Sequence, residues 1–109
     1  TSGGNIQIPN DNAKLQIGAS QNLEIYNNSN TAFLHHTTGG IKVSVAGGSN
    51  QFQINKGVVD EHMAKFIADG AAELYYDNSK KFETTSTGIK TTGNVAANET
   101  IVLVLTDYT

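Results

Sequence analysis

The sequence predicts an all-β fold of short strands, of the β-solenoid, β-prism or sandwich-like kind. Three observations predict it. Apolar residues alternate with polar ones in short bursts, which places one face of each segment on a core and the other in solvent. Clusters of Gly, Asn, Asp and Ser separate the bursts at nearly regular intervals. Gly, Asn, Thr, Ser and Gln make up 47 of the 109 residues, a mixture that suits strands and turns better than helices.

Length and charge exclude several classes of protein. The 109 residues hold one domain or a few stacked repeats. Because every basic residue is Lys and the net charge is −3, the chain lacks the Arg fork that reads phosphates and bases, and we expect no nucleic-acid partner. No apolar run reaches the roughly 20 residues of a membrane-spanning helix, so we expect no membrane insertion. Without Cys, neither a disulfide framework nor a thiolate metal site is available.

The bursts of alternation predict about ten strands along the chain. Turn residues such as Asp11-Asn12, Gly39-Gly40 and Asp77-Asn78 lie between the bursts and tolerate left-handed backbone. The last alternating segment, residues 101–105, is the most apolar, and as an uncovered edge strand it would tend to pair with other chains. The alternating segments are residues 6–8, 15–17, 23–25, 41–45, 52–54, 74–76 and 101–105.

One stretch has a helical alternative. Val59, Met63 and Phe66 fall at helical spacing, and Asp60 is a candidate cap. Against this, Asp69-Gly70 is a strong hairpin signal between two strand-like segments, residues 65–68 and 71–76. The sequence therefore favours strands joined by a turn in which Gly70 takes a positive φ.

The chain also resembles itself at an offset of 48 to 50 residues. Residues 23–26, 27–29 and 40–42 match residues 72–75, 77–79 and 88–90. Landmarks in the same order predict a repeat, with Phe33 and Phe82 in similar surroundings and Ile41 and Ile89 beginning equivalent strands. The expected organisation is a connecting segment (1–13), a first β repeat (14–48), a connecting β-hairpin region (49–71), a second β repeat (72–93) and a C-terminal apolar strand (94–109).

Residues 64–89 resemble a module of predicted structural and tail-fibre proteins of marine bacteriophages, especially cyanophages. Upstream, residues 14–18, 23–26 and 28–30 are similar to the segment that usually precedes that module. The resemblance implies a structural protein on the surface of a virion, in an elongated β-rich fibre, and a homotrimer. Its partners would be further copies of itself and other virion proteins. Since the chain starts without Met, we expect a piece of a longer protein.

Candidate sites are few, and we expect no catalytic residues and no cofactor. Glu73 could pair with Glu83 or Asp77 as in a glycosidase, but Glu73 recurs as Glu24 and the chain has neither Trp nor Arg to build a sugar groove. A residue that recurs with its scaffold is more simply architectural. The chain is therefore interpreted as a non-enzyme.

Two smaller groups of residues remain as candidates for binding. His35 and His36 are adjacent, so a strand would turn them to opposite faces, and we expect no metal site there. Tyr26, Tyr75 and Tyr76 would form a binding surface if they were exposed together. Two functions follow: a structural segment of a virion appendage, or a module that binds a host glycan or surface protein on the same scaffold.

Overall fold

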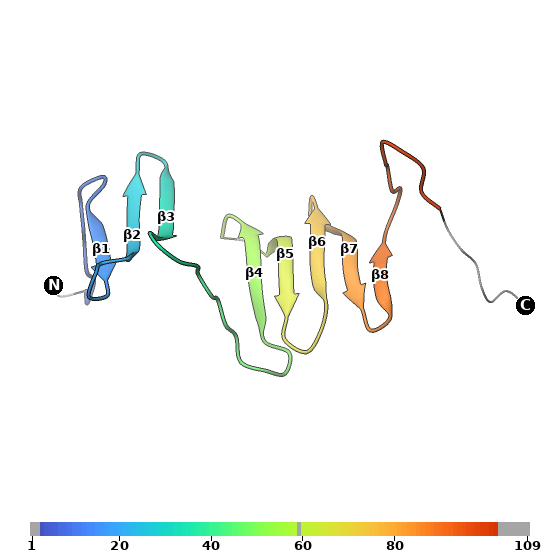
Figure 1. The fold of residues 1–109 in the computed structure, drawn as a ribbon, viewed down its shortest axis with the longest axis horizontal. Helices are drawn as coiled ribbons and strands as arrows, with labels where there is room; N and C mark the ends of the chain where they lie inside the picture. The colour runs from blue at the N-terminus through green and yellow to red at the C-terminus, as the bar shows by residue number, and fades with distance from the viewer. Residues whose placement is uncertain (1–2, 59, 103–109) are drawn as a thin grey trace, which may run out of the picture. The chain divides into compact units, whose positions relative to one another are not determined.

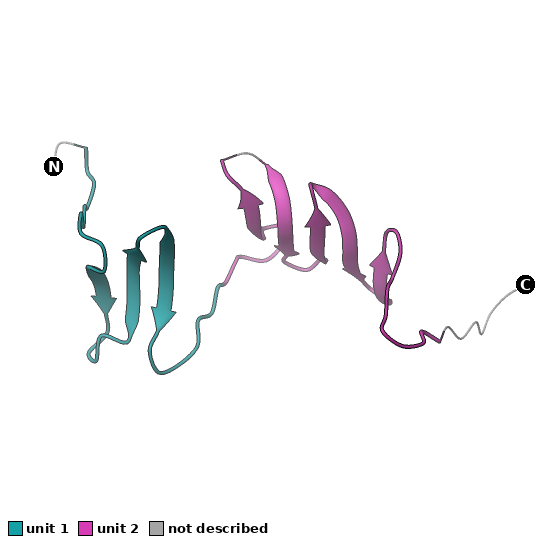
Figure 2. Ribbon diagram, turned by 90° about the horizontal axis from the view of Figure 1, so that it is seen from above, with its two compact units in different colours: residues 1–43 teal, residues 44–109 magenta. Residues whose placement is uncertain are grey.

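The computed structural model describes residues 3–58 and 60–102, and every regular element within them is a β-strand. The chain divides into two compact units, residues 1–43 and 44–109 (Figure 2). Each unit contains one antiparallel sheet of consecutive strands (Figure 1). The all-β prediction is therefore confirmed. The strands are β1 (Lys14–Ile17), β2 (Leu23–Asn28), β3 (Thr31–His36), β4 (Gln51–Lys56), β5 (Glu61–Ile67), β6 (Ala72–Tyr76), β7 (Ser79–Thr85) and β8 (Gly88–Thr91).

The first sheet has the order β1-β2-β3 and two chemically different faces. Leu15, Ile25 and Leu34 lie opposite one another across its three strands. Since side chains alternate between faces, Glu24 lies on the other face, opposite Gln16 and His35. One face is therefore apolar and the other polar.

The second sheet has the order β4-β5-β6-β7-β8 and the same division. Ala64 in β5 lies opposite both Ile54 and Leu74, and Leu74 lies opposite Phe82. On the other face, Glu73 lies between two charged partners on the neighbouring strands, Lys65 and Glu83. The alternation of apolar and polar residues in the sequence therefore gives this sheet one apolar face and one polar face.

The strands meet in tight turns made by residues that accept left-handed backbone. Between β6 and β7, Asp77 and Asn78 take φ values of 48° and 62°, and between β2 and β3, Ser29 takes 53°. Two successive positive φ values are characteristic of the type I′ hairpin turn, whose twist matches that of the strands. The Asx-rich stretches expected to be turns at these positions are turns.

The hairpin at Asp69-Gly70 is confirmed, with one correction. β5 and β6 pair up to Phe66 and Ala72, Ile67 N–H donates to Ala71 O, and Gly70 N–H donates to Ile67 O at 3.0 Å. The residue with positive φ is Asp69 at 54°, whereas Gly70 is not in that region. The expectation of a left-handed Gly70 was wrong, because Asp also tolerates this conformation and occupies the strained position of the turn. The helical alternative for residues 59–67 is also excluded for the described part, since β5 begins at Glu61.

Two β-bulges interrupt the second sheet. Pairing shifts by one residue between Ile54 and Asn55, where Met63 is the extra residue in β5. It shifts again between Leu74 and Tyr75, where Lys81 is the extra residue in β7. On both sides of each bulge, residues that lie opposite each other on paired strands still share the same face of the sheet.

The expectation that Phe33 and Phe82 share the same surroundings was wrong. Phe33 lies opposite Tyr26 on the face of its sheet that carries Glu24. Phe82 lies opposite Leu74, on the face away from Glu73. The cause is the bulge in β7: Lys80 lies opposite Tyr75, and the extra residue Lys81 then shifts the pairing by one residue, so that Phe82 lies opposite Leu74 and not opposite Glu73. A one-residue shift of register moves the side chains beyond it to the other face.

Several expected strands are not formed. Residues 6–8 and 41–45 show no strand pairing, so Ile41 does not begin a strand equivalent to the one that contains Ile89. Residues 101–102 are also unpaired, and the remainder of the C-terminal apolar segment lies outside the described residues. The described residues contain no helix of the length and apolarity needed to cross a membrane.

Candidate functional site

The apolar face of the second sheet is largely open to solvent. Ala64 is the one buried apolar residue of the described part of the chain. Apart from the half-buried Phe82, the larger apolar side chains of this face remain exposed by about two-fifths or more. These exposed side chains are Phe52 (38%), Ile54 (44%), Phe66 (45%), Leu74 (50%), Tyr76 (75%) and Ile89 (67%).

The first sheet exposes a smaller apolar face of the same character. Leu15, Ile17, Ile25 and Leu34 keep 43–53% of their surface. Contiguous exposed apolar patches of this kind mark interaction surfaces in soluble proteins. Both sheets therefore offer a face suited to binding another apolar surface.

The polar face of the second sheet is held together by a charge cluster centred on Lys80. Lys80 Nζ lies 2.6 Å from Glu73 Oε2 and 2.6 Å from Glu83 Oε2, and Lys90 Nζ lies 3.7 Å from Glu83 Oε1. Glu73 is almost completely buried although it lies on the polar face. The hydrogen bond from Lys80 lowers the pKa of Glu83, and the two carboxylates raise the pKa of Lys80.

The polar face of the first sheet repeats this arrangement around Glu24. Lys14 Nζ donates to Glu24 Oε2 at 2.8 Å, and Gln16 Nε2 donates to Glu24 Oε1 at 3.0 Å. These hydrogen bonds, with the one from Lys14 the larger cause, lower the pKa of the buried Glu24 carboxyl. Each sheet thus buries one glutamate that pairs with a lysine of a neighbouring strand, which favours a role in fixing strand register.

Acid is expected to destabilise both sheets. The carboxyls of Glu24 and Glu83 have folded pKa values below their usual value of 4.5. Such groups stabilise the fold at pH values above the unfolded pKa, and the contribution is lost as the pH falls through the folded pKa. Thermal melts between neutral pH and pH about 2 should therefore show a fall in Tm that begins near pH 4 to 5. The double variant Glu24→Gln/Glu83→Gln should respond less steeply, and an unchanged response would contradict the role of these carboxylates.

The three candidate tyrosines do not form one surface. Tyr75 and Tyr76 are adjacent in β6 and point to opposite faces of the sheet. Tyr75 lies beside the His62 ring, with ring centroids 5.4 Å apart, whereas Tyr76 is exposed on the apolar face. In the first sheet, Tyr26 stacks on Phe33 at 4.8 Å with nearly parallel rings.

The two adjacent histidines also separate. His35 Nδ1 lies 3.7 Å from Glu24 Oε2 on the polar face, and His36 lies on the apolar side of β3, where its Nδ1 accepts from Thr38 N–H at 3.4 Å. Among residues 3–58 and 60–102, no three His, Asp or Glu side chains are grouped to hold a metal ion.

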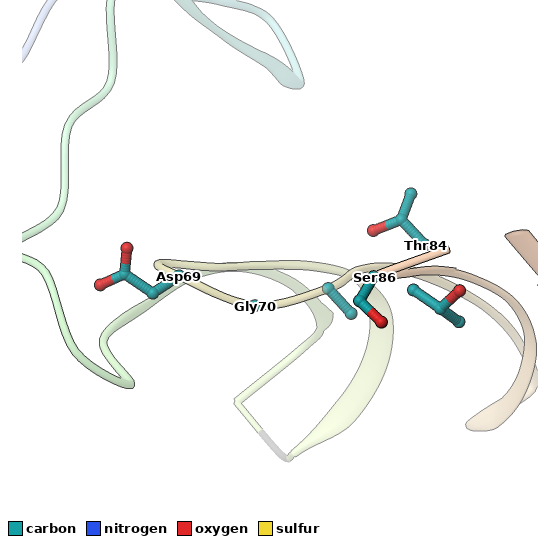
Figure 3. A pocket seen from close by; sticks show the side chains of 6 residues that line it. Asp69, Gly70, Thr84 and Ser86 are labelled. Atoms are coloured by element: carbon teal, nitrogen blue, oxygen red, sulfur yellow. The ribbon is translucent and has the colours of Figure 1, made fainter. Parts of the chain in front are cut away.

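A shallow pocket of about 400 Å³ lies beside the β5–β6 turn. Its lining comes from residues 69–71 and 84–86, and Figure 3 shows the Asp69 carboxylate turned away from the Thr84 and Ser86 hydroxyls. That carboxylate instead accepts Gly48 N–H at 3.0 Å, so it ties two turns together. Thr84 Oγ1 likewise accepts Ala72 N–H at 2.9 Å. The Asp69 and Thr84 side chains of the pocket are thus engaged in holding the backbone.

The carboxylate pair that most resembles a glycosidase pair is Glu73 with Glu83. The two residues lie directly opposite on β6 and β7, and Lys80 bridges them. Sequence reasoning noticed Glu73 and Glu83 but missed Lys80 as their shared partner, and it likewise missed Lys14 and Gln16 as the partners of Glu24. These partners could have been found from the alternation, because Lys or Gln occupies positions of the neighbouring expected strand that face the same side of the sheet as the glutamate.

No protein-family model, no curated protein and no solved structure matches this chain.

Proposed function

We propose that this chain is a structural module of a bacteriophage virion, part of a tail fibre or similar surface appendage, and that it works by associating with copies of itself. The observation that supports the proposal best is the pair of two-faced sheets whose apolar faces are open. Ordering the backbone costs about 1–2 kcal/mol per residue, and hydrophobic burial normally offsets this cost. With Ala64 as the single buried apolar residue among those described, association is the available source of that burial.

The dimensions of the second sheet suit a specific interface. Five strands at about 4.8 Å spacing and about six residues at 3.4 Å each give a face of roughly 24 by 20 Å. Two such faces in contact bury on the order of 1,000 Å², near the lower bound for specific association. A homotrimer, as expected from the resemblance to phage fibre modules, would enclose three apolar faces around one axis. The polar faces, whose glutamates are already paired with lysines, would remain in solvent.

A matched pair of lysine substitutions in β4 tests the use of the apolar face. Ile54 and Gln53 are neighbours on an edge strand, both are exposed, and they lie on opposite faces. Ile54→Lys should raise the dissociation constant of the assembly about tenfold or more, because an ammonium group would be buried without a partner. Gln53→Lys should leave association unchanged. Light scattering over a dilution series measures both, and a stable folded monomer of the unchanged chain at micromolar concentration would refute the proposal.

The place of the chain in the virion needs a separate test. Immunogold labelling of particles that carry this chain should mark an appendage or the outer surface. Labelling restricted to infected-cell lysate, with none on purified particles, would contradict the virion role while leaving self-association intact.

A receptor-binding module is the second candidate function, and one observation favours it. The stacked Tyr26 and Phe33 rings lie on a polar face beside Lys14, whose Nζ is 4.8 Å from the Tyr26 ring centroid. Aromatic groups with neighbouring hydrogen-bond donors suit sugar binding. Glycan-array binding by the assembled chain, lost in Tyr26→Ala with assembly retained, would support this function.

A further inference from the structure

Residues 41–45 have the sequence of a strand but no strand partner. Ile41, Val43 and Val45 alternate with Lys42 and Ser44, and β-branched residues in alternation are typical of strands. The three apolar side chains are 49%, 55% and 41% exposed. Within the described part of the chain, the backbone of these five residues makes no hydrogen bond. Each unpaired residue leaves a donor and an acceptor available to another strand.

The same tripeptide is a strand elsewhere in the chain. Gly-Ile-Lys occurs at residues 40–42 and again at residues 88–90, where it begins β8 and pairs with β7. β8 follows its partner after a two-residue turn, Ser86-Thr87. The corresponding stretch, from Phe33 to Gly40, is one residue longer than that from Phe82 to Gly88, and the chain leaves the sheet after β3 without closing a hairpin.

The outer edge of β3 is open in the described structure. β3 pairs with β2 alone, and the ladder ends beyond His36 with Thr37 N–H donating to Asn22 O. Leu34 on this edge strand is 53% exposed on the apolar face. An open edge beside an exposed apolar residue is a template for pairing with another strand.

We propose that residues 41–45 form a strand on the β3 edge of a second copy of this chain. Placing Val43 opposite Leu34 in an antiparallel pair sets Ile41 beside His36 and Val45 beside Ala32, all on the apolar face. Lys42 and Ser44 then fall on the polar face. A shift by one residue would instead put the three β-branched side chains on the face of the buried glutamate, so alternation selects this parity of register.

A second copy fits this pairing better than the chain itself. After Thr37 the chain turns away from β3, because Thr38 N–H is directed to His36 Nδ1 and the residues that follow make no bond to the β3 backbone. Each copy carries one unpaired segment and one open β3 edge, so an assembly contains as many open edges as segments that can pair with them. Such a contact is heterologous and closes into a ring when the rotation allows. This inference rests on the self-association proposed above.

Cysteine cross-linking tests the pairing, since the chain has no cysteine of its own. Val43→Cys and Leu34→Cys chains are mixed in denaturant, refolded together and oxidised mildly. Opposed residues of an antiparallel pair place their Cβ atoms close enough for a disulfide, so the V43C–L34C dimer should exceed a control dimer about fivefold or more. The control pairs V43C with I17C, since Ile17 lies on the same apolar face but in β1, at the other edge of the sheet, and is equally exposed.

The outcomes separate the two proposals. Assembly by light scattering with no excess of the V43C–L34C dimer overturns the strand exchange and leaves the proposed function standing. A cross-link confined within single chains in the double variant also overturns it. A chain that stays monomeric at every concentration overturns both. Excess intermolecular cross-link, together with slowed amide exchange of residues 41–45 on assembly, is the expected result.

Discussion

Phe82→Ala is expected to lower the free energy of unfolding of the assembled protein by about 2–4 kcal/mol. Phe82 lies in β7 on the apolar face, opposite Leu74 in β6 and Thr91 in β8. It is partly buried within the single chain, and association would cover the rest. Truncation removes the ring from both environments, so the loss includes the transfer energy and the cavity left behind.

Phe33→Ala is the matched control. Phe33 is 37% exposed and stacks on Tyr26, on the polar face of the first sheet. Its loss should cost only about 1 kcal/mol, the scale of an aromatic pair plus partial burial. Urea unfolding of both variants at one fixed protein concentration measures the difference, because the stability of an assembly depends on concentration. Equal costs for the two variants would contradict the assignment of these rings to different faces.

Gly70→Val is expected to destabilise the protein by about 1–3 kcal/mol, for a steric reason. A Cβ at Gly70 would lie 3.0 Å from Ile67 Cγ2 and 3.3 Å from Ile67 Cβ. The turn could relieve this contact only by moving Ile67, the last residue of β5. The φ of Gly70 does not contribute, because Asp69 holds the left-handed position.

A second substitution separates crowding from loss of backbone freedom. Shortening the neighbour in Gly70→Val/Ile67→Ala should recover part of the lost stability relative to the sum of the two single changes. Gly40→Val serves as the control, since a Cβ there meets nothing within 4 Å, and it should change stability by less than about 0.5 kcal/mol. Strictly additive effects in the cycle would mean that Ile67 is not the cause.

Local signals predicted much of the fold. Turn residues located the hairpins at Asp69 and Asp77, and alternation identified β1, β2, β4 and β6. Residues 61–67 form a strand and not a helix, despite the helical spacing of their apolar residues, because β4 and β6 pair with β5 over most of its length. Such long-range pairing decides between local preferences that are nearly equal.

Register and pairing were beyond local reasoning. The matched positions of Phe33 and Phe82 suggested one environment, but the bulge at Lys81 shifts the pairing of β7 by one residue and places Phe82 on the opposite face. Residues 41–45 alternate as well as any strand, yet a strand forms only where an edge is available. A sequence shows that a segment can pair and does not show which edge reaches it.

The candidate site was predicted only in part. Glu24 and Glu73 were recognised as architectural because they recur, and the structure buries both of them. Lys14 is the partner of Glu24, and Lys80 is the partner of Glu73. In each case the two residues lie on different strands and come together only when those strands pair. The candidate tyrosine surface was lost because Tyr75 and Tyr76 alternate across β6.

The two bulges make the second sheet tolerant of length change at particular points. Met63 and Lys81 each occupy a place that has no counterpart on the neighbouring strand. Deleting either residue, or one beside it in the same strand, would leave the flanking pairs adjacent and in their present faces, whereas a deletion within a strand that has no extra residue, such as β6, would turn the rest of that strand over. We therefore expect deletions among variants of this chain to fall at or next to positions 63 and 81, and insertions or deletions elsewhere in these strands to be rare.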